Sequence, residues 1–302
     1  MIKVISDIDT NVAEDGLCAA VGFFDGLHRG HRKIIELCRG EYPLAVISFE
    51  NQPAAFINSQ STAHKLMSNA EKEKLLGEMG VEYLFSYLFD EKMRNTSAEE
   101  FFEKAIVKNN VKRLACGFNF RFGKGGCGDT ELLRKLCEEY GITLLIGDAE
   151  TEDGEVISST LIKKYLYKGD AKKASQLLGR DFYITGIVAE GKKLGRTLGF
   201  PTANVYVPSE IVVPKWGVYE SYTTVGGVRY PSVTNIGNNP TIGEDIRVES
   251  HIIGFDGDIY GEEIKIEFHD YIRGEMKFSG IEELAAQVHK DIDTVKERNG
   301  IV

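Results

Sequence analysis

The chain has 302 residues, of which 42% are hydrophobic and 27% are charged, and its formal net charge is −10. These values are typical of a globular protein of about two domains, and the acidic balance argues against nucleic acid as the main partner, because phosphate backbones bind basic surfaces. No apolar stretch is as long as a membrane span, and the first residues carry acids where a secretion signal carries bases, so we expect no membrane association and a cytoplasmic location.

The cysteines are odd in number and all lie in the first half of the chain. None belongs to a Cys-x-x-Cys pair, so neither a disulfide framework nor a zinc site is indicated. We expect buried free thiols at the following positions: Cys18, Cys38, Cys116, Cys127 and Cys137.

The first predicted elements surround the motif Gly22-Phe-Phe-Asp-Gly-Leu-His-Arg-Gly-His31. The apolar run Leu17–Phe24 predicts a buried strand, and Arg32–Arg39 predicts a short helix. Between them, Asp25 and Gly26 supply typical turn residues. The motif therefore predicts a strand, a tight turn and the start of a helix.

Two histidines stand at this predicted helix start. Free backbone N–H groups there bind anions, so we expect His28 and His31 to face a phosphate, with a flat base packed against Gly30 between them. Transfer of a nucleotidyl group to a phosphate needs positioning and charge stabilisation more than a general base, and histidines suit that task. The alternative is a pair of surface histidines, which would leave the flanking glycines and aromatic residues unexplained.

Alternating strands and helices continue to about residue 178. The pattern predicts a doubly wound α/β domain with a parallel sheet, in which ligands gather at the carboxyl ends of the strands. The predicted strands are Pro43–Phe49, Tyr83–Phe89, Arg113–Cys116 and Thr143–Ile146, and the predicted helices are Ala70–Met79, Ala98–Lys108, Thr130–Tyr140 and Ala171–Leu178.

Two further segments of this half are candidates for ligand contacts. The loop Gly117–Asp129 is rich in glycine and aromatic residues and carries Asn119 and Arg121, so it suits a planar ring with a phosphate, or it is a surface loop that merely needs glycines. Ser158-Ser-Thr160 precedes another helical run that contains Lys163. Hydroxyls at a helix start are first of all caps, but three of them beside a lysine also suit a triphosphate.

From Phe182 the sequence pattern is that of short strands separated by turns, which predicts a small antiparallel β-barrel. An amphipathic helix, Ile281–Arg298, is predicted to follow it. We place the boundary at residue 180, giving domains 1–180 and 181–302. The predicted strands are Tyr183–Val188, Val218–Thr224, Arg229–Thr234, Val248–Phe255 and Ile264–Tyr271.

The barrel half contains a basic, glycine-rich stretch, Gly191–Asn204, that lacks the Walker pattern. Thr202 and Asn204 lie two residues apart, on one side of an extended chain, and their neutral oxygens suit Mg²⁺ that is also held by ATP phosphates. Glu249 lies in a strand-like run and could take a proton from an alcohol, although such a residue is more often simply solvated.

The order of these motifs along one chain resembles the bifunctional riboflavin kinase/FMN adenylyltransferase family, the prokaryotic FAD synthetases. The resemblance extends from the opening motif to the terminal helix. It rests on the opening motif and on Asn119-Phe-Arg-Phe-Gly123, Ser158-Ser-Thr-Leu-Ile-Lys163, Gly195-Arg-Thr-Leu-Gly-Phe-Pro-Thr-Ala-Asn204, Asn235-Ile-Gly-Asn-Asn-Pro-Thr241 and Arg273-Gly-Glu-Met-Lys-Phe278.

The resemblance implies two ATP-dependent reactions. The barrel would phosphorylate riboflavin to FMN, with Glu249 as base and with Thr202 and Asn204 on Mg²⁺. The first domain would join AMP from a second ATP to FMN, giving FAD and pyrophosphate, with His28 and His31 steadying the α-phosphate. The implied substrate- and nucleotide-binding residues are Gly22, Phe23, Asp25, Gly26, Gly30, Asn119, Arg121, Ser159, Thr160, Lys163, Gly191, Gly195, Arg196, Gly199, Pro201 and Arg273.

Two positions depart from the family pattern. Gln52 stands where the family usually has histidine, and Lys163 stands where it commonly has arginine. Neither replacement keeps the full chemistry, because glutamine carries no charge and lysine offers no bidentate fork. Three alternatives remain: a riboflavin kinase whose first domain is inactive through the change at Gln52, a flavin-binding protein without turnover, and a nucleotidyltransferase for another substrate, which the attached barrel opposes.

Overall fold

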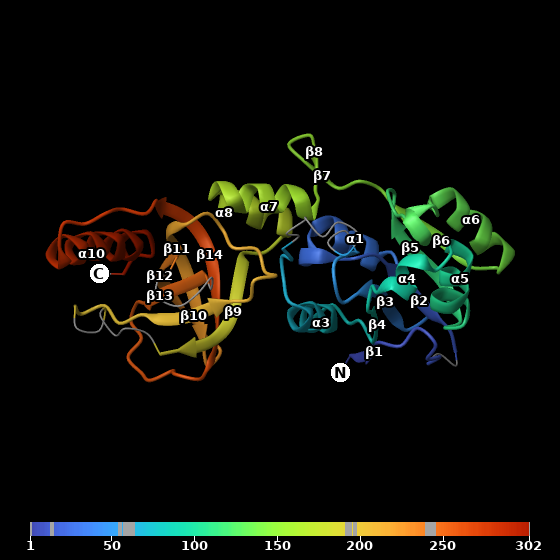
Figure 1. Ribbon diagram of the computed structural model, residues 1–302, viewed down its shortest axis with the longest axis horizontal. Coiled ribbons are helices and arrows are strands. Elements are labelled where there is room, and N and C mark those ends of the chain that lie inside the picture. Colours follow the sequence, from blue (N-terminus) through green and yellow to red (C-terminus); the bar gives the residue numbers. More distant parts are fainter. Residues whose placement is uncertain are drawn as a thin grey trace. The chain divides into compact units, whose positions relative to one another are not determined.

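The computed structural model describes residues 2–12, 15–53, 56, 64–190, 195, 198–238 and 246–301. The chain divides into two compact units, Met1–Ser159 and Thr160–Val302, each built around its own sheet (Figure 1). Our boundary at residue 180 stays a prediction.

The first unit contains a six-stranded parallel sheet in the order β1-β4-β3-β2-β5-β6 (Figure 1). From β2 the chain builds outward to one side through β3 and β4 and then to the other through β5 and β6. The carboxyl end of β2 therefore lies where the order of the strands reverses, the usual ligand site of such sheets. The strands are β1 (Lys3–Ile5), β2 (Leu17–Val21), β3 (Leu44–Phe49), β4 (Tyr83–Tyr87), β5 (Val111–Gly117) and β6 (Thr143–Gly147).

Apolar cores cover both faces of this sheet. Alternate residues of β2 enter different cores: Leu17, Ala19 and Val21 enter one, whereas Cys18 and Ala20 enter the other. The first core includes side chains of α5 (Ala98–Phe102) and α6 (Thr130–Glu139), and the second includes side chains of α1 (Arg29–Glu36) and α3 (Asn69–Glu78). The continuous apolar strands are thus explained by burial on both faces, and the doubly wound α/β prediction is confirmed.

Several local predictions were imprecise. The strand ends at Val21, because Phe24 adopts a left-handed conformation (φ 55°) before the short helix η1 (Asp25–Leu27). The next helix begins at Arg29 because the His28 side chain caps it. In place of one helix over 98–108, α5 is followed by a π-helical turn, η2 (Glu103–Val107).

Other elements of the first unit were not predicted. They are β1, the helix α4 (Glu91–Asn95), the short helix η3 (Lys124–Gly126), and a two-stranded ribbon of β7 (Thr151–Glu152) and β8 (Glu155–Val156). Four of the five cysteines are buried free thiols as expected, but Cys127, which follows η3, is exposed because its loop lies on the surface.

The helix α7 (Ser159–Lys168) begins at the last residue of the first unit, and in the second unit α7 and α8 (Ala171–Leu178) precede a closed antiparallel barrel in the order β10-β13-β12-β11-β14-β9. Pairing of β9 with β10 closes it, and Gly186 permits this, because a Cβ there would lie 2.3 Å from Val205 Cγ1. The barrel prediction is confirmed, although β10 was not predicted as a strand. The strands are β9 (Phe182–Ala189), β10 (Ala203–Val207), β11 (Gly217–Val225), β12 (Val228–Asn238), β13 (Ile246–Ile252) and β14 (Glu263–Arg273).

Part of the barrel interior is filled by hydroxyl groups. The side chains of Ser221, Thr223, Thr234 and Ser250 are fully buried and hydrogen bonded in a chain, with oxygen–oxygen distances of 2.6 to 2.9 Å. Each hydroxyl can both donate and accept, so these buried polar atoms satisfy one another.

The terminal helix α10 (Ile281–Arg298) packs its apolar face on the barrel. Ile292 and Val295 join Val218 and Val233 in a buried cluster, as the amphipathic pattern predicted. At the end of the helix, Arg298 Nη1 donates at 2.8 Å to the buried carboxylate of Glu220 on β11. The helix is therefore held by apolar packing along its length and by an ion pair at its end.

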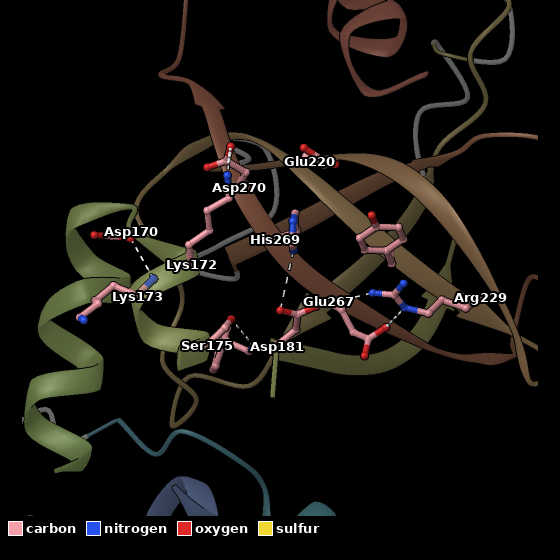
Figure 2. Close-up of polar contacts among 12 residues, drawn as sticks. Asp170, Lys172, Lys173, Ser175, Asp181, Glu220, Arg229, Glu267, His269 and Asp270 are labelled. Carbon is pink, nitrogen blue, oxygen red and sulfur yellow. Dashed lines mark hydrogen bonds and ion pairs between the residues drawn. The ribbon is translucent and has the colours of Figure 1, made fainter. Parts of the chain in front are cut away.

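Ion pairs on the outer surface of the barrel connect its strands with one another and with α8 (Figure 2). Arg229 donates to Glu267 at 2.7 Å, lies 3.5 Å from Asp181, and stacks on the ring of Tyr222. Lys172 pairs with Asp270 at 2.8 Å, which ties α8 to β14.

None of the helices in the described part of the chain combines the length and apolar character that a membrane span requires.

Candidate active sites

The predicted histidine pair lies directly beyond the carboxyl end of β2, at the start of α1. The two rings are stacked, with centroids 3.5 Å apart and an interplanar angle of 20°, and the edge of Phe24 packs against His31. His28 Nδ1 accepts the backbone N–H of His31 at 3.3 Å. An accepting nitrogen carries no proton, so His28 is neutral and can donate only from Nε2.

His31 is also held in its neutral form. Burial, reinforced by the neighbouring His28 and Lys72, lowers the pKa of His31 well below its ordinary value. Its Nδ1 is buried and has no hydrogen-bond partner among the described residues. The pair therefore offers neutral imidazoles that can donate hydrogen bonds to a phosphate, rather than two cations.

The small and acidic residues of the motif shape its backbone. A Cβ at Gly30 would lie 3.3 Å from the His28 ring, so this glycine lets the imidazole fold back over the helix start. Buried Asp25 accepts the Leu66 backbone N–H at 2.7 Å, and the Ser159 hydroxyl donates to the Asp25 carbonyl at 2.8 Å. Ser159 is thus brought to the motif. Packing of a base against Gly30 stays a prediction, as do ligand contacts of Gly22, Phe23, Asp25 and Gly26.

Lys72 is a candidate that the sequence did not reveal. It lies on α3, is 3% exposed, and donates to Ser48 Oγ at 3.1 Å and to the Phe49 carbonyl at 2.9 Å. Ser48 Oγ in turn donates to the Phe23 carbonyl at 2.9 Å, which links the lysine to the motif. Burial lowers the pKa of Lys72 to about 8, although the carboxylate of Asp25 opposes this shift.

The substituted position Gln52 follows β3 at the same end of the sheet. Its side-chain Oε1 is buried and accepts no hydrogen bond from the described residues. A buried amide oxygen without a donor costs free energy, so a bound ligand that donates a hydrogen bond would be favoured there.

The loop after β5 presents its polar and aromatic residues in alternation. Phe122 is buried against the core and Phe120 stacks on it at 5.6 Å, whereas Asn119 and Arg121 are exposed. Arg121 lies 3.6 Å from Asp129, the cap of α6. Phe120 and Phe122 therefore have a packing role, whereas the exposed Phe118, Asn119 and Arg121 are accessible to a ligand.

A group of ion pairs covers the first turn of α1. Arg29 donates to Glu152 at 2.6 Å and to Glu150 at 3.1 Å, and Lys33 pairs with Glu150 at 3.2 Å. These basic side chains beside the histidines are thereby neutralised by the unit's own carboxylates. Thr160 and Lys163 lie on α7, in the second unit, and their contacts with a phosphate stay predictions.

A second candidate site is a cavity of about 710 Å³ in the barrel unit, a volume suited to a small organic ligand. Its lining combines apolar residues such as Phe200 and Val218 with several residues of the predicted kinase site. The predicted residues that line it are Gly195, Pro201, Thr202, Asn204, Glu249 and Arg273. Gly199 lies beside this stretch without lining the cavity, and Gly191 and Arg196 lie outside the described residues.

The register of the barrel brings Asn204 and Glu249 together. They are direct partners in the antiparallel pairing of β10 with β13, and Thr202 lies just before β10. The Asn204 amide also donates to the Thr202 carbonyl at 3.2 Å. Neutral side-chain oxygens and a carboxylate thus face one cavity. They fit a magnesium–nucleotide complex, because Mg²⁺ prefers oxygen ligands and takes few from the protein.

Arg247 is a further residue that the sequence did not mark. Its Nη2 lies 2.5 Å from Glu249 Oε1, and its Nε donates to Asn204 Oδ1 at 2.6 Å. Arg273, at the end of β14, is held by the buried carboxylate of Asp291 on α10. Among the residues the structure describes, no three acidic, histidine or cysteine side chains converge as a metal cluster.

Comparison with known proteins finds a separate protein family for each of the two candidate sites. A model of the FAD synthetase family matches residues 11–161, and a model of the riboflavin kinase family matches residues 178–299. The chain is 36% identical to a bifunctional riboflavin kinase/FMN adenylyltransferase of Escherichia coli K12 over 296 residues, covering 95% of this chain and 94% of that protein. A protein of the same description from Bacillus subtilis is 36% identical over 283 residues, covering 90% and 89% of the two chains.

A solved structure shares the whole architecture. It is described as a macrolide-efflux protein from Streptococcus pneumoniae, is 27% identical, and superposes with a TM-score of 0.87 over 98% of both chains.

Proposed function

This chain belongs to the bifunctional riboflavin kinase/FMN adenylyltransferase family, and from that premise we propose which of its residues carry the two reactions. The chain is an enzyme of flavin-cofactor synthesis. It phosphorylates riboflavin to FMN and adenylylates FMN to FAD, with ATP as co-substrate of both steps. We assign the kinase to the barrel cavity and the adenylyltransferase to the histidine motif, and we propose that the enzyme acts in the cytoplasm.

In the kinase step, Glu249 takes the proton of the terminal ribityl hydroxyl. The resulting oxygen attacks the γ-phosphorus of ATP, and ADP leaves. Thr202 and Asn204 would hold Mg²⁺, which would neutralise charge on the phosphates when bound. The observation that carries this assignment is the register that pairs Asn204 with Glu249 on one wall of the cavity.

In the adenylyl transfer, a phosphate oxygen of FMN attacks the α-phosphorus of ATP and pyrophosphate leaves. The nucleophile is already ionised, so no base is needed. His28 and His31 donate hydrogen bonds to the α-phosphate, and Asn119, Arg121 and Ser159 contribute to the grip on nucleotide and flavin. The stacked, neutral state of the imidazoles supports this role, since each ring can present one N–H.

Two variants separate the activities. Glu249→Gln lowers FMN formation from riboflavin by about 10²- to 10⁴-fold, the usual worth of a general base, while FAD is still made from supplied FMN. The double variant His28→Ala/His31→Ala does the reverse. Products are separated chromatographically after incubation with riboflavin or FMN, ATP and Mg²⁺.

The same assay tests the alternatives. FMN without FAD in the unaltered protein would contradict the adenylyltransferase and indicate a kinase with a silent first unit. Neither product would indicate a flavin-binding protein. Loss of both activities in either variant would contradict two separate sites.

A further inference from the structure

Arg247 connects the two groups on which the proposed kinase site depends. It lies two residues before Glu249 on β13, so both side chains project from the same face of the strand. Across the ladder, Asn204 is the direct partner of Glu249. The guanidinium thus lies between an amide oxygen and a carboxylate, at 2.6 and 2.5 Å.

This arginine is part of the cavity wall. Its side chain is only 13% exposed, whereas the outer-surface Arg229 is 47% exposed. Arg247 lines the cavity together with Asn204 and Glu249. A side chain with five N–H donors and a permanent charge satisfies both oxygen groups in the ligand-free enzyme.

The guanidinium and a divalent cation would compete for the same oxygen. The Nε–H of Arg247 is directed at Asn204 Oδ1, the amide atom that would face a metal ion. An oxygen that accepts a hydrogen bond from a cation at 2.6 Å is a poor ligand for a second cation beside it, because the two positive charges repel at short range.

We propose that Arg247 is a positioning residue of the kinase site: it holds Asn204 and Glu249 in place before the nucleotide arrives, and it releases Asn204 when the magnesium–ATP complex binds. The inference rests on the proposed function. Its consequence is that entry of the metal–nucleotide complex includes the cost of displacing an internal cation, so the affinity of the site is set partly by Arg247.

The test compares Arg247→Gln and Arg247→Lys with the matched control Arg229→Gln, which removes an ion-paired arginine from the outer barrel surface. Calorimetry measures binding of the magnesium complex of a β,γ-imido analogue of ATP, and electron paramagnetic resonance measures binding of Mn²⁺ alone. Neither measurement depends on turnover. Thermal unfolding of each variant checks that the barrel is intact.

We expect Arg247→Gln to tighten binding of the metal–nucleotide analogue at least about fivefold, a typical size for the coupling of two mutually exclusive states, and to tighten Mn²⁺ binding in the same direction. Arg247→Lys keeps the positive charge but loses the planar guanidinium, so we expect its affinities to lie between those of the unaltered protein and of Arg247→Gln. In steady state the KM for ATP falls in Arg247→Gln, and kcat falls as well because Glu249 is less well oriented. Arg229→Gln matches the unaltered protein.

Weaker analogue binding in Arg247→Gln would overturn the inference, because it would make the arginine a phosphate ligand. Unchanged affinities would overturn it too. In both cases FMN formation by the unaltered protein would leave the proposed function standing. If the unaltered protein formed no FMN, the proposed function would fail, and the inference with it. If Arg247→Gln does not fold, Arg247→Lys decides by the same comparison.

Discussion

Arg273 and Asp291 form a two-pronged ion pair between the last residue of β14 and the middle of α10, with Nη2 and Nε of the arginine 2.7 and 3.0 Å from Oδ2 of the carboxylate. Asp291 is buried, and its other oxygen also accepts from Gln287 at 2.9 Å. The helix therefore fixes Arg273, which the family resemblance implies as a substrate-binding residue.

Asp291→Asn removes the charge that holds Arg273. We expect the KM for riboflavin to rise about tenfold, the usual worth of a hydrogen bond to a charged group, while FAD formation from supplied FMN is unchanged. The control is Asp293→Asn, an exposed position on the same helix. Steady-state kinetics of FMN formation measures the effect, and equal losses in Asp291→Asn and Asp293→Asn would contradict a specific role.

The buried ammonium of Lys72 makes the stability of the first unit depend on pH. Burial lowers its pKa to about 8 from an ordinary value of 10.5, so the unfolded chain holds the proton more tightly. Stability contributed by this group is therefore present above pH 10.5 and is lost as the pH falls through 8. Between pH 11 and pH 7, we expect the unaltered protein to lose about 3 kcal/mol relative to Lys72→Met.

Denaturant unfolding followed by far-ultraviolet circular dichroism, repeated across this pH range, measures the difference. Lys74→Met, an exposed position two residues along the same helix, serves as the control and leaves the pH dependence unchanged. A Lys72→Met curve parallel to that of the unaltered protein would show that the ammonium is solvated.

Burial of His31 makes the stability of the first unit sensitive to acid. Burial lowers the pKa of His31 below its ordinary value of 6.5, so its contribution to stability is complete above pH 6.5 and declines as the pH falls below that value. We expect His31→Gln to flatten the acid limb of the stability curve between pH 6.5 and 5. The exposed His289→Gln is the control. An unchanged acid limb would mean that His31 titrates normally.

The ion pair between Arg298 and Glu220 stabilises the second unit. The carboxylate is 6% exposed and the guanidinium 43% exposed, so Arg298→Ala should cost about 2 kcal/mol, between the values for surface and buried pairs. The only tryptophan of the chain, Trp216, lies in this unit, and its fluorescence reports the unfolding transition. Arg298→Lys restores part of the loss, and an effect of Arg298→Ala below about 0.5 kcal/mol would indicate a solvated pair.

Local patterns were sufficient for much of the fold. The strand, turn and helix around His28 are neighbours in sequence, so their order places the histidines at the carboxyl end of β2 without further information. The terminal helix was predicted with the bounds it has, Ile281–Arg298, because one apolar stripe runs along its whole length.

Long-range pairing was beyond the sequence patterns. Asn204 faces Glu249 only because β10 and β13 pair in one register, and β10 itself is five residues long and begins two residues after Pro201. Lys72 is indistinguishable in sequence from Lys74, since both lie in one polar helix, and tertiary packing alone buries the first. The contacts of Arg247 with Asn204 and Glu249 could not be predicted for the same reason, because they depend on that register.

Closure of the barrel has a consequence for association with other chains. The six strands β9 to β14 satisfy their backbone groups in a ring, so this sheet has no free edge onto which a foreign strand could add. The open sheet of the first unit has two edge strands, β1 and β6, whose outer backbone groups are not paired within the sheet. At the β1 edge, the short length of the strand, three residues, restricts how many backbone hydrogen bonds a foreign strand could form. Aggregation by strand addition, under mild heating or during synthesis, should therefore begin in the first unit and spare the barrel.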